Sequence, residues 1–355
     1  MIVRNEEEHL SDCLRCVIDL VDEIIIVDTG SSDRTRQIAA IYTKQIIEFN
    51  WNDDFSEARN FAFSQASMEY ILWLDADDRL MEVDRGKLRR LKEHLQPGID
   101  SVVMEYNLAM DEEGRPAVIT RLHRLVRRIK KYMWKEPIHE YLDVYDGETI
   151  ISDIAVTHCR VGDHSLRNLE ILRKWCGSNG KLQGRLLYYY ASEHADLGWY
   201  EKAVVFFKRY LQEDQGDREG QLMACARLAD CYSKLGHSEE RLQALLKSFQ
   251  YGLPHAEFCS NLGSCFEERE EWETAVYWYT QALNLAKAPR TLPLENKILS
   301  TWLPHCRLCV CYARLGNLTK AYEHNASALV YLPNDRNLIA NKVNLEQLMS
   351  VIHME

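Results

Sequence analysis

Short apolar runs alternate with helical hydrophobic patterns along residues 1–165. A helical pattern covers 6–21, and a second one covers 55–66. The first is carried by apolar residues at helical spacing: Leu10, Leu14, Val17, Ile18 and Val21. The apolar, often β-branched runs at 23–27, 46–49 and 70–74 are typical of buried strands. Because strands that alternate with helices form mostly parallel sheets, this part of the chain predicts an α/β domain.

Three weaker patterns complete this part of the chain. Ser32 or Asp33 is suited to cap a helix that begins near Arg34. Strand patterns at 101–108 and 149–157 add to the sheet or to an antiparallel edge of it. The predicted α/β domain therefore extends to about residue 165.

Strand patterns end after residue 165, and a repeated helical pattern replaces them. Four segments share a turn followed by a helical run, and their turns are separated by 38, 34 and 46 residues at Gly198, Gly236, Glu270 and Gly316. Five residues after the turn, three of the repeats have alanine and the second has arginine, at Ala203, Ala275, Ala321 and Arg241. The pattern resembles the tetratricopeptide repeat, whose period is about 34 residues. It predicts an all-α domain over 166–355.

Composition and charge narrow the classes of protein that fit. The net charge of −11 argues against a general nucleic-acid binder, which needs a basic footprint. No apolar run is long enough to span a membrane, and no charged leader with an apolar core is present, so we expect a cytoplasmic protein. The eleven cysteines are then expected to be reduced thiols. The pairs Cys13/Cys16 and Cys306/Cys309 offer too few converging ligands for structural zinc.

Two carboxylates follow the predicted strand 70–74. If the strand end is extended, Asp75 and Asp77 project to the same side, at the edge where open α/β sheets bind ligands. Paired carboxylates are costly there unless a cation neutralises them, and Mg²⁺ or Mn²⁺ bridging to a diphosphate is the natural partner. The alternative is an acidic surface turn before a helix.

Other candidate residues lie at strand ends or in basic segments. Asp28 ends the strand at 23–27, where its carboxylate is placed to accept a base N–H, and Arg59 is suited to clamp phosphate or base. Six cations between Arg121 and Lys131 suggest a flexible basic loop over a diphosphate, although charge runs are usually solvated faces. Two histidines are also candidates, although a lone histidine is more often structural than a ligand. His139 beside Glu140 offers an acid–base pair, and His158 offers a metal ligand.

Taken together, these segments resemble family-2 glycosyltransferases of the GT-A fold. The resemblance is carried by IVRNEEEHLSDCL at 2–14, VDTGSSDRT at 27–35, FSEARN at 55–60, WLDADD at 73–78, RLHR at 121–124, IHE at 138–140 and His158. It is closest to the branch that is fused to tetratricopeptide repeats, which includes the sublancin-type peptide S-glycosyltransferases. It implies inverting transfer from a nucleoside-diphosphate sugar.

The resemblance also implies roles for individual residues. The nucleotide would be lined by Val3, Arg4, Asn5, Glu6, Asp28 and Arg59, with Asp75 near the ribose and Arg124 on the diphosphate. Asp77, with Asp75 and His158, would hold Mn²⁺ or Mg²⁺. His139 and Glu140 would lie on the acceptor side, with Glu140 as the base. The chain departs from the family at Met1, where several further strand residues usually precede this segment, and at Glu136, where a small residue is usual.

These patterns lead to one preferred function and several alternatives. We expect a uridine-diphosphate sugar as donor and a peptide or protein side chain as acceptor, with a glycan or cell-envelope polysaccharide as the alternative. A nucleotidyltransferase and a non-catalytic scaffold with a vestigial front domain are the rivals. We expect the repeats to select the acceptor or to form a homodimer. Their candidate aromatic residues, most of which must pack the core, are Tyr188, Tyr189, Tyr190, Trp199, Trp272 and Trp278.

Overall fold

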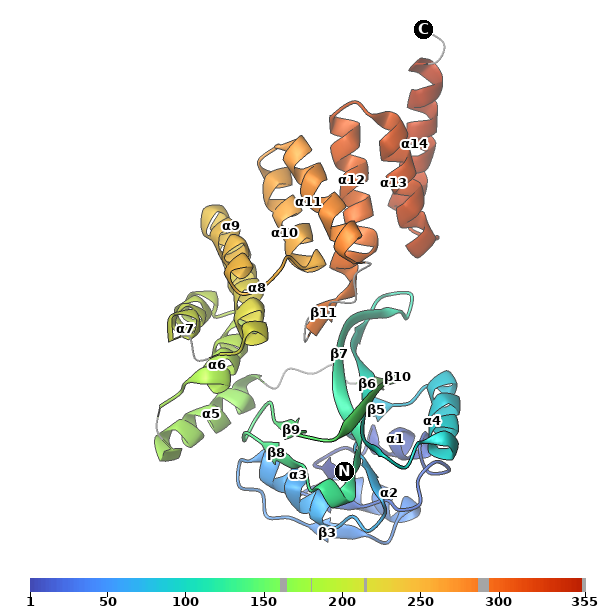
Figure 1. The fold of residues 1–355 in the computed structure, drawn as a ribbon, viewed down its shortest axis with the longest axis vertical. Helices are drawn as coiled ribbons and strands as arrows, with labels where there is room; N and C mark the ends of the chain where they lie inside the picture. Colours follow the sequence, from blue (N-terminus) through green and yellow to red (C-terminus); the bar gives the residue numbers. More distant parts are fainter. Residues whose placement is uncertain (160–164, 180, 214–215, 287–293, 353–355) are drawn as a thin grey trace. The chain divides into compact units, whose positions relative to one another are not determined.

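The computed structural model describes residues 1–159, 165–179, 181–213, 216–286 and 294–352. The chain forms two compact units, Met1–Leu182 and Gln183–Glu355 (Figure 1). Helix α5 (Ser165–Asn179), which the sequence pattern placed with the repeats, belongs to the N-terminal unit. Its Leu169 and Leu172 are buried, and its Lys174 pairs with Asp53 at 2.7 Å.

The N-terminal unit begins with a small parallel sheet in the order β1-β2-β3. These strands are β1 (Ile2–Val3), β2 (Ile26–Asp28) and β3 (Ile46–Glu48), with helix α2 (Thr35–Tyr42) between the last two. Ile26 and Val27 are fully buried, as expected for a strand with no polar alternation. The parallel register places Asp28 opposite Val3, so the ends of β1 and β2 meet at one edge.

A second, mixed sheet carries the rest of the unit. Strand β6 pairs antiparallel with β7 and parallel with β10, β10 pairs with β5, and β4 pairs antiparallel with β7. The strands are β4 (Tyr70–Leu72), β5 (Asp78–Arg79), β6 (Ile99–Met110), β7 (Pro116–Arg127) and β10 (Glu148–His158). Helix α4 (Glu82–His94) packs on this sheet through Leu88. Its partners in one core cluster are the buried side chains of β6 and β10, Val102, Met104, Ile154 and Val156. The predicted α/β architecture is confirmed, with more antiparallel pairing than expected.

The prediction of a flexible basic loop at 121–131 is wrong. Residues 116–127 form β7, and the 3₁₀ turn Arg128–Lys130 follows it. Four of the six cations are paired with carboxylates of neighbouring elements: Arg121 with Glu105, Arg124 with Asp78, Arg127 with Glu69 and Lys130 with Asp146. A cation-rich run therefore forms a strand here because the adjacent strands and turns supply the counter-charges.

The first predicted helix is also shorter than its pattern. Regular helix covers only α1 (Leu10–Arg15), and 16–20 continues as single turns in which i→i−3 and i→i−4 bonds alternate. Of the predicted apolar face, Leu10, Leu14 and Val17 are buried, but Ile18 is 45% exposed. Hydrophobic spacing therefore identified most of the buried face, but it did not determine where the regular hydrogen bonding ends.

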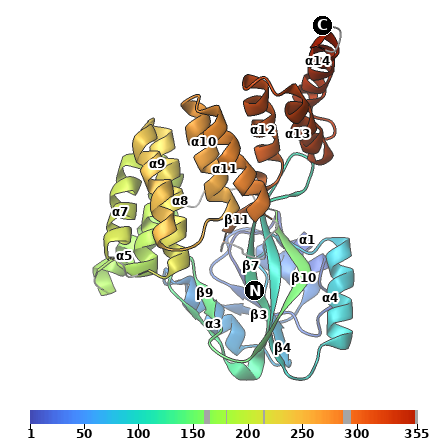
Figure 2. The ribbon, with the colours of Figure 1, turned by 45° about the horizontal axis from the view of Figure 1, so that its top comes forward.

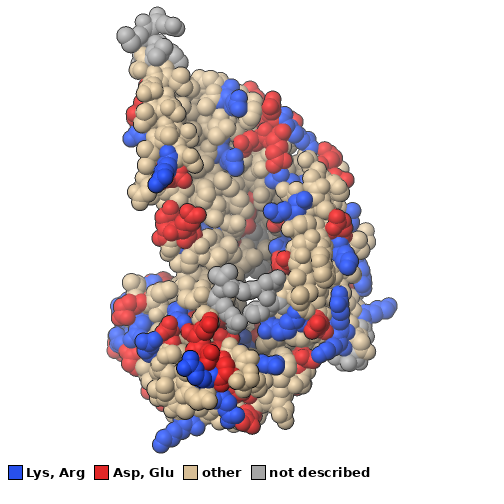
Figure 3. Space-filling view, turned by 180° about the vertical axis from the view of Figure 1, so that it is seen from behind, with Lys and Arg blue, Asp and Glu red and all other residues tan. Residues whose placement is uncertain are grey.

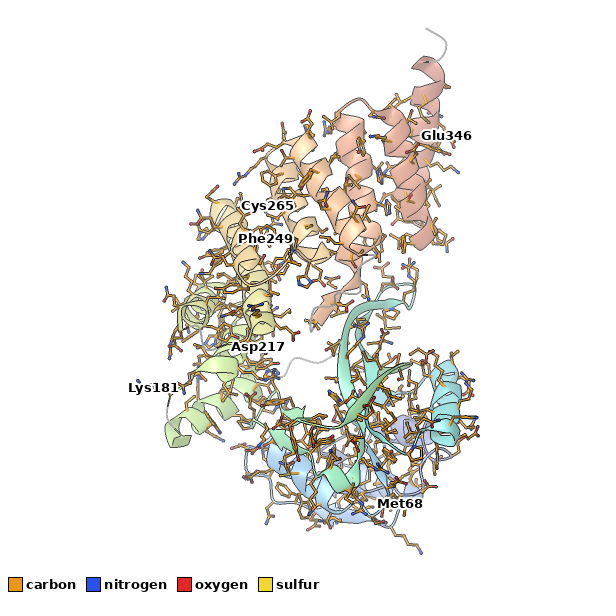
Figure 4. The ribbon with its side chains drawn as sticks, viewed as in Figure 1. Met68, Lys181, Asp217, Phe249, Cys265 and Glu346 are labelled. Carbon is orange, nitrogen blue, oxygen red and sulfur yellow. The ribbon has the colours of Figure 1, made fainter. Side chains whose placement is uncertain are left out.

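An apolar cavity of about 570 Å³ lies inside the N-terminal unit. Its walls include Met1, the segment 21–26 that leads into β2, and the segment 68–74 that contains β4; Met68 is labelled in Figure 4. The Met1 amino group donates to the Ile25 carbonyl at 3.0 Å, and burial lowers its pKa to about 6.

Two short elements and one helix complete the N-terminal unit. Strands β8 (Met133–Lys135) and β9 (Tyr141–Asp143) form an antiparallel pair. Helix α3 (Phe55–Ser64) is capped by Asp54, whose side chain accepts from Glu57 N. Asn60 of α3 exchanges two hydrogen bonds with the backbone of Trp134, at 2.8 and 3.0 Å, and so fixes β8 against the helix.

The C-terminal unit is a row of antiparallel helix pairs (Figure 2). The pairs are α6 (Gly184–Asp196) with α7 (Tyr200–Glu213), α8 (Arg218–Leu235) with α9 (Ser238–Lys247), α10 (Ala256–Glu268) with α11 (Trp272–Leu285), and α12 (Trp302–Arg314) with α13 (Leu318–Tyr331), followed by α14 (Arg336–Ile352). Asp217, labelled in Figure 4, caps α8 by accepting from Gly220 N at 2.7 Å. Short irregular segments, β11 (Leu294–Asn296) and a 3₁₀ turn (Lys297–Ser300), precede α12.

The four predicted repeat turns are confirmed. Gly198, Gly236 and Gly316 have φ near +75°, and Glu270 has φ +60°, so all four positions are left-handed. Such a residue commonly ends a helix, and glycine adopts it without steric cost. The structure therefore confirms a repeated helix–turn–helix unit and shows one repeat that closes its turn with a residue poorly suited to it.

The helix contacts within each repeat depend on small residues. Ala203, Ala275 and Ala321 are completely buried, which allows the paired helices to approach closely. At the equivalent position Arg241 is buried and donates to Glu268 at 2.6 Å. A Cβ at Gly263 would lie 2.7 Å from the ring of Tyr279, so only glycine fits there without displacement of the ring.

Charges of both signs occur on the face drawn in Figure 3, where lysine and arginine as well as aspartate and glutamate lie on both units. Among the described residues, no helix is long and apolar enough to cross a membrane.

Candidate active site

The turn after β4 arranges the acidic residues differently from the prediction. Asp78 N donates to Asp75 O at 3.1 Å, so 75–78 form a tight turn rather than an extended strand end. Side chains two residues apart then diverge. Asp75 faces Arg59 at 2.7 Å, whereas Asp77 faces His158, with 3.6 Å between Oδ1 and Nδ1.

Asp77, Asp78 and His158 form the candidate metal centre. Each offers one ligand atom, and these three atoms lie within 4.8 Å of one another. The pairing of β10 with β5 brings them together, because His158 is in register with Asp78. In the structure Asp78 lies in this cluster and Asp75 does not, because the Asp75 carboxylate pairs with Arg59.

The chemistry of this cluster fits a divalent cation such as Mn²⁺ or Mg²⁺. Two carboxylates and one imidazole are hard or borderline donors, and Asp78 Oδ1 is buried without a hydrogen-bond partner among the described residues. Burial raises the pKa of Asp78 above its ordinary value, a cost that a bound cation would offset. Tyr106 lies beside the centre, with its hydroxyl 3.1 Å from His158 Nδ1.

Arg124 lies beneath this centre and is completely buried. It donates to Asp78 Oδ2 at 2.9 Å, and its guanidinium carbon is 3.8 Å from the ring centroid of Trp73 and 4.2 Å from that of Tyr106. The diphosphate contact implied by the family resemblance does not fit this burial. Arg124 instead balances the negative charge of the turn from below.

Arg59, whose side chain is only 11% exposed, joins two other candidates. Its Nε donates to Glu140 at 2.6 Å and its Nη2 donates to Asp75 at 2.7 Å. Burial alone would raise the pKa of Asp75, but the charges of Arg59 and Arg124 hold it below its ordinary value. One guanidinium therefore connects the turn after β4 with the turn between β8 and β9.

That second turn is unusual in its backbone. Glu136 and His139 have φ of +72° and +53°, in the left-handed region that residues other than glycine and asparagine seldom adopt. Ile138 is buried, and Phe55 N donates to Pro137 O at 2.8 Å. Strain of this kind concentrates at functional sites, where the surrounding structure maintains it. The turn presents Glu140 to Arg59.

Asp28 and the segment 3–6 form a third group. Asp28 Oδ1 accepts from Gly30 N and Ser31 N, both at 2.9 Å, while Oδ2 is buried without a hydrogen-bond partner among the described residues. An unsatisfied buried acceptor fits an N–H donor of a nucleotide base. Asp28 thus combines a structural role in its turn with one oxygen left for a ligand.

The segment 3–6 folds back on the loop after β2. Thr29 N donates to the carbonyl of Val3 at 3.0 Å, Ser32 N to Asn5 Oδ1 at 2.8 Å, and Glu6 N to Thr35 Oγ1 at 2.7 Å. Val3 is buried, whereas Arg4 and Asn5 are exposed. Val3 and Glu6 support the Asp28 loop through their backbone and Asn5 supports it through its side chain, which the sequence pattern did not reveal.

Comparison with protein families identifies both parts of the chain. Residues 1–173 match the model of glycosyl transferase family 2, and residues 259–293 match a tetratricopeptide repeat model. A TPR repeat-containing protein of Synechococcus elongatus is 38% identical over 143 residues, which are 40% of this chain and 34% of that protein. Glycosyltransferase SunS of Bacillus subtilis is 32% identical over 143 residues, 39% of this chain and 33% of its own.

A shorter similarity and a structural one were also found. Poly-beta-1,6-N-acetyl-D-glucosamine synthase of Staphylococcus epidermidis is 38% identical over 80 residues, 21% of this chain and 19% of that enzyme. YrrB, a TPR protein described as having an unusual peptide-binding site, has 16% identity and a TM-score of 0.41 over 51% of this chain and 85% of its own. The chain spans about a third of the length of the first two relatives. Its N-terminal part is thus similar to glycosyl transferase family 2, and a segment similar to the tetratricopeptide repeat follows.

Proposed function

We propose that this chain transfers a sugar, with inversion, from a nucleoside-diphosphate sugar to an acceptor. The observation that supports this most strongly is the joining of Asp77, Asp78 and His158 in one cluster beside the Arg59 network. A cation at the cluster would neutralise the departing diphosphate. The match of residues 1–173 to glycosyl transferase family 2 supports the same reaction class.

The reaction needs a nucleophile, a base and a leaving group. We assign Glu140 as the base, with His139 beside it on the acceptor side. The acceptor oxygen or sulfur attacks the anomeric carbon as Glu140 takes its proton. The bond between that carbon and the phosphate oxygen breaks, and its electron pair leaves with the diphosphate. Most of the acceleration is expected from positioning and charge stabilisation.

Donor recognition is assigned to the edge formed by β1 and β2. The open Oδ2 of Asp28 supports a contact to a base N–H, for which we favour uracil, and 3–6 holds the loop that carries it. For the acceptor we favour a peptide or protein side chain because repeats of this type commonly bind proteins, with a glycan as the alternative. A homodimer through the repeats is a further role that they are suited to fill.

A panel of nucleotide sugars with Mn²⁺, scored for nucleotide release, tests the proposal. Release of nucleoside diphosphate from one donor supports sugar transfer or donor hydrolysis. Release of pyrophosphate from a nucleoside triphosphate and sugar phosphate would instead identify a nucleotidyltransferase. Failure to bind any nucleotide by calorimetry would indicate that the front unit serves only as a scaffold.

A further inference from the structure

We propose that Arg59 is a positioning residue that orients Glu140 for the acceptor, an inference that rests on the proposed function. The family resemblance gave Arg59 a different task, contact with the nucleotide. The two tasks make opposite demands on the side chain. A nucleotide clamp needs a guanidinium free to meet the ligand, whereas a positioning residue is held by protein groups on both sides.

The hydrogen bonds of Arg59 favour the positioning role. Its Nε is 2.6 Å from Glu140 Oε1 and its Nη2 is 2.7 Å from Asp75 Oδ1, and only 11% of its side chain is exposed. Guanidinium donors project in fixed directions, so two such bonds define the orientation of both carboxylates. Moving Arg59 to a phosphate would leave Glu140, also only 11% exposed, without its counter-charge.

Aromatic rings restrict the guanidinium further. Its central carbon lies 5.2 Å from the ring centroid of Trp73 and 4.7 Å from that of Trp134, and the two rings meet edge to face at 4.7 Å. Asn60, one residue along the same helix, fixes the backbone of Trp134. Arg59 is therefore enclosed by rings that are themselves anchored.

The backbone of the acceptor-side turn needs such an anchor. Two left-handed residues, Glu136 and His139, lie just before Glu140, and such conformations persist where the surroundings hold them. Phe55 ties Pro137 to α3, and Arg59 ties Glu140 to the same helix. Helix α3 thus sets both the path of the turn and the direction of its carboxylate.

The geometry also divides the two oxygens of Glu140. Oε1 accepts from Arg59, which leaves Oε2 to receive the proton of an acceptor hydroxyl or thiol. In that step the acceptor O–H or S–H bond breaks and its proton moves to Oε2. The acceptor forms its bond to the anomeric carbon while the phosphate leaves. Because Arg59 also holds Asp75 of the turn 75–78, the base and the metal-side turn share one anchor.

Full-length Arg59→Met and Arg59→Lys test the proposal, with Arg36→Met as control. Arg36 lies on a different helix, α2, and forms an exposed ion pair with Glu48 at the end of β3. We expect Arg59→Met to lower kcat for transfer about 100-fold. Arg59→Lys should recover about tenfold relative to Arg59→Met. Binding of uridine or guanosine diphosphate with Mn²⁺, measured by calorimetry, is expected to stay within about threefold of wild type. Weakened nucleotide binding with unchanged kcat at saturating donor would overturn the proposal.

A thermal double-mutant cycle tests the same pair without any turnover. Arg59→Met, Glu140→Gln and the double variant are melted under one condition, and we expect non-additive changes because the residues share a bond. Additive changes would overturn the proposal. If the wild type releases no nucleotide from any donor, the proposed function fails, and the cycle still decides whether Arg59 holds Glu140.

Discussion

The two units treat buried charge in different ways. In the N-terminal unit, Arg124 and Asp78 are paired with no exposure of either side chain, and Arg59 is enclosed between two carboxylates. In the C-terminal unit, the buried Arg241 pairs with Glu268, whose side chain is half exposed. Removing two charges from water costs more than their attraction usually returns, so fully buried pairs contribute little to stability. Their concentration in one unit indicates where the chemistry is.

The buried contacts of the repeats are made by small residues, whereas those of the first unit include charged pairs. Alanines at the helix contacts and glycines at the turns serve packing, and Gly263 leaves room for Tyr279. This difference predicts that single changes in the N-terminal unit mainly alter turnover, while those in the repeats mainly alter stability. The predictions below test that separation, beginning with the largest expected effect.

Asp77→Ala should reduce nucleotide release by about 100- to 1,000-fold while the melting temperature stays close to wild type, because the change removes a candidate metal ligand from the edge of the site. Asp217→Ala is the matched control in the repeats: loss of its cap should cost about 1 kcal/mol and leave release unchanged. Both variants are assayed for nucleotide release and melted by circular dichroism. Wild-type release by the Asp77 variant would refute the metal assignment.

Glu257 predicts a pH dependence of the repeat unit. Burial, with smaller contributions from Glu295 and Asp230, raises its pKa from 4.5 to about 8, against the opposing effects of Asn296 N–H and Lys297. The folded state binds the Glu257 proton more tightly than the unfolded state does. The contribution of this proton to the free energy of unfolding is therefore fully present below about pH 4.5 and is lost as the pH rises through about 8. Glu257→Gln should remove that loss, on the order of 1–3 kcal/mol.

Melts of the helical signal between about pH 5 and pH 8.5 measure the Glu257 effect. Glu239→Gln is a suitable control because its carboxylate is exposed on α9. Parallel pH profiles for wild type and Glu257→Gln would contradict the prediction.

The cavity beside Met1 predicts a gain of stability in the first unit. A short β-branched segment fused before Met1 is expected to enter the space between 21–26 and 68–74, pair with the strand edges and bury apolar area. We expect a gain of about 1–2 kcal/mol in the free energy of unfolding. A glycine–proline segment of equal length is the control, and equal melting temperatures for the two fusions would show that the cavity does not accept a strand.

The smallest expected effect concerns a repeat turn. Glu270 has φ +60° where the other three repeats have glycine, so Glu270→Gly should raise stability by about 1 kcal/mol. Gly236→Ala, the reverse change at an equivalent turn, should lower it by a similar amount. Chemical denaturation measures both. A lower midpoint for Glu270→Gly would mean that contacts of the glutamate outweigh its backbone strain.

The sequence predicted some features well because their signals are local. The repeat turns follow from spacing alone, and the place of Asp28 at the end of β2 follows from a buried run that ends at a Gly/Ser turn. Strand β7 was missed because its cations resemble a solvated loop, and their counter-charges lie on distant segments such as Glu69 and Asp78. The sequence could not show that Asp78 rather than Asp75 lies beside His158, because that placement depends on the pairing of β10 with β5.

Separation of the units after Leu182 tests whether the first unit alone carries the chemistry. The cut must follow α5, whose Leu169 and Leu172 are buried and whose Lys174 binds Asp53 in the first unit. Hydrolysis of the nucleotide sugar and transfer to the natural acceptor are then measured on the folded fragment Met1–Leu182 and on the full chain. We predict that the fragment retains hydrolysis and loses transfer. Loss of hydrolysis in a soluble, folded fragment would contradict this division and show that the repeats complete the active site.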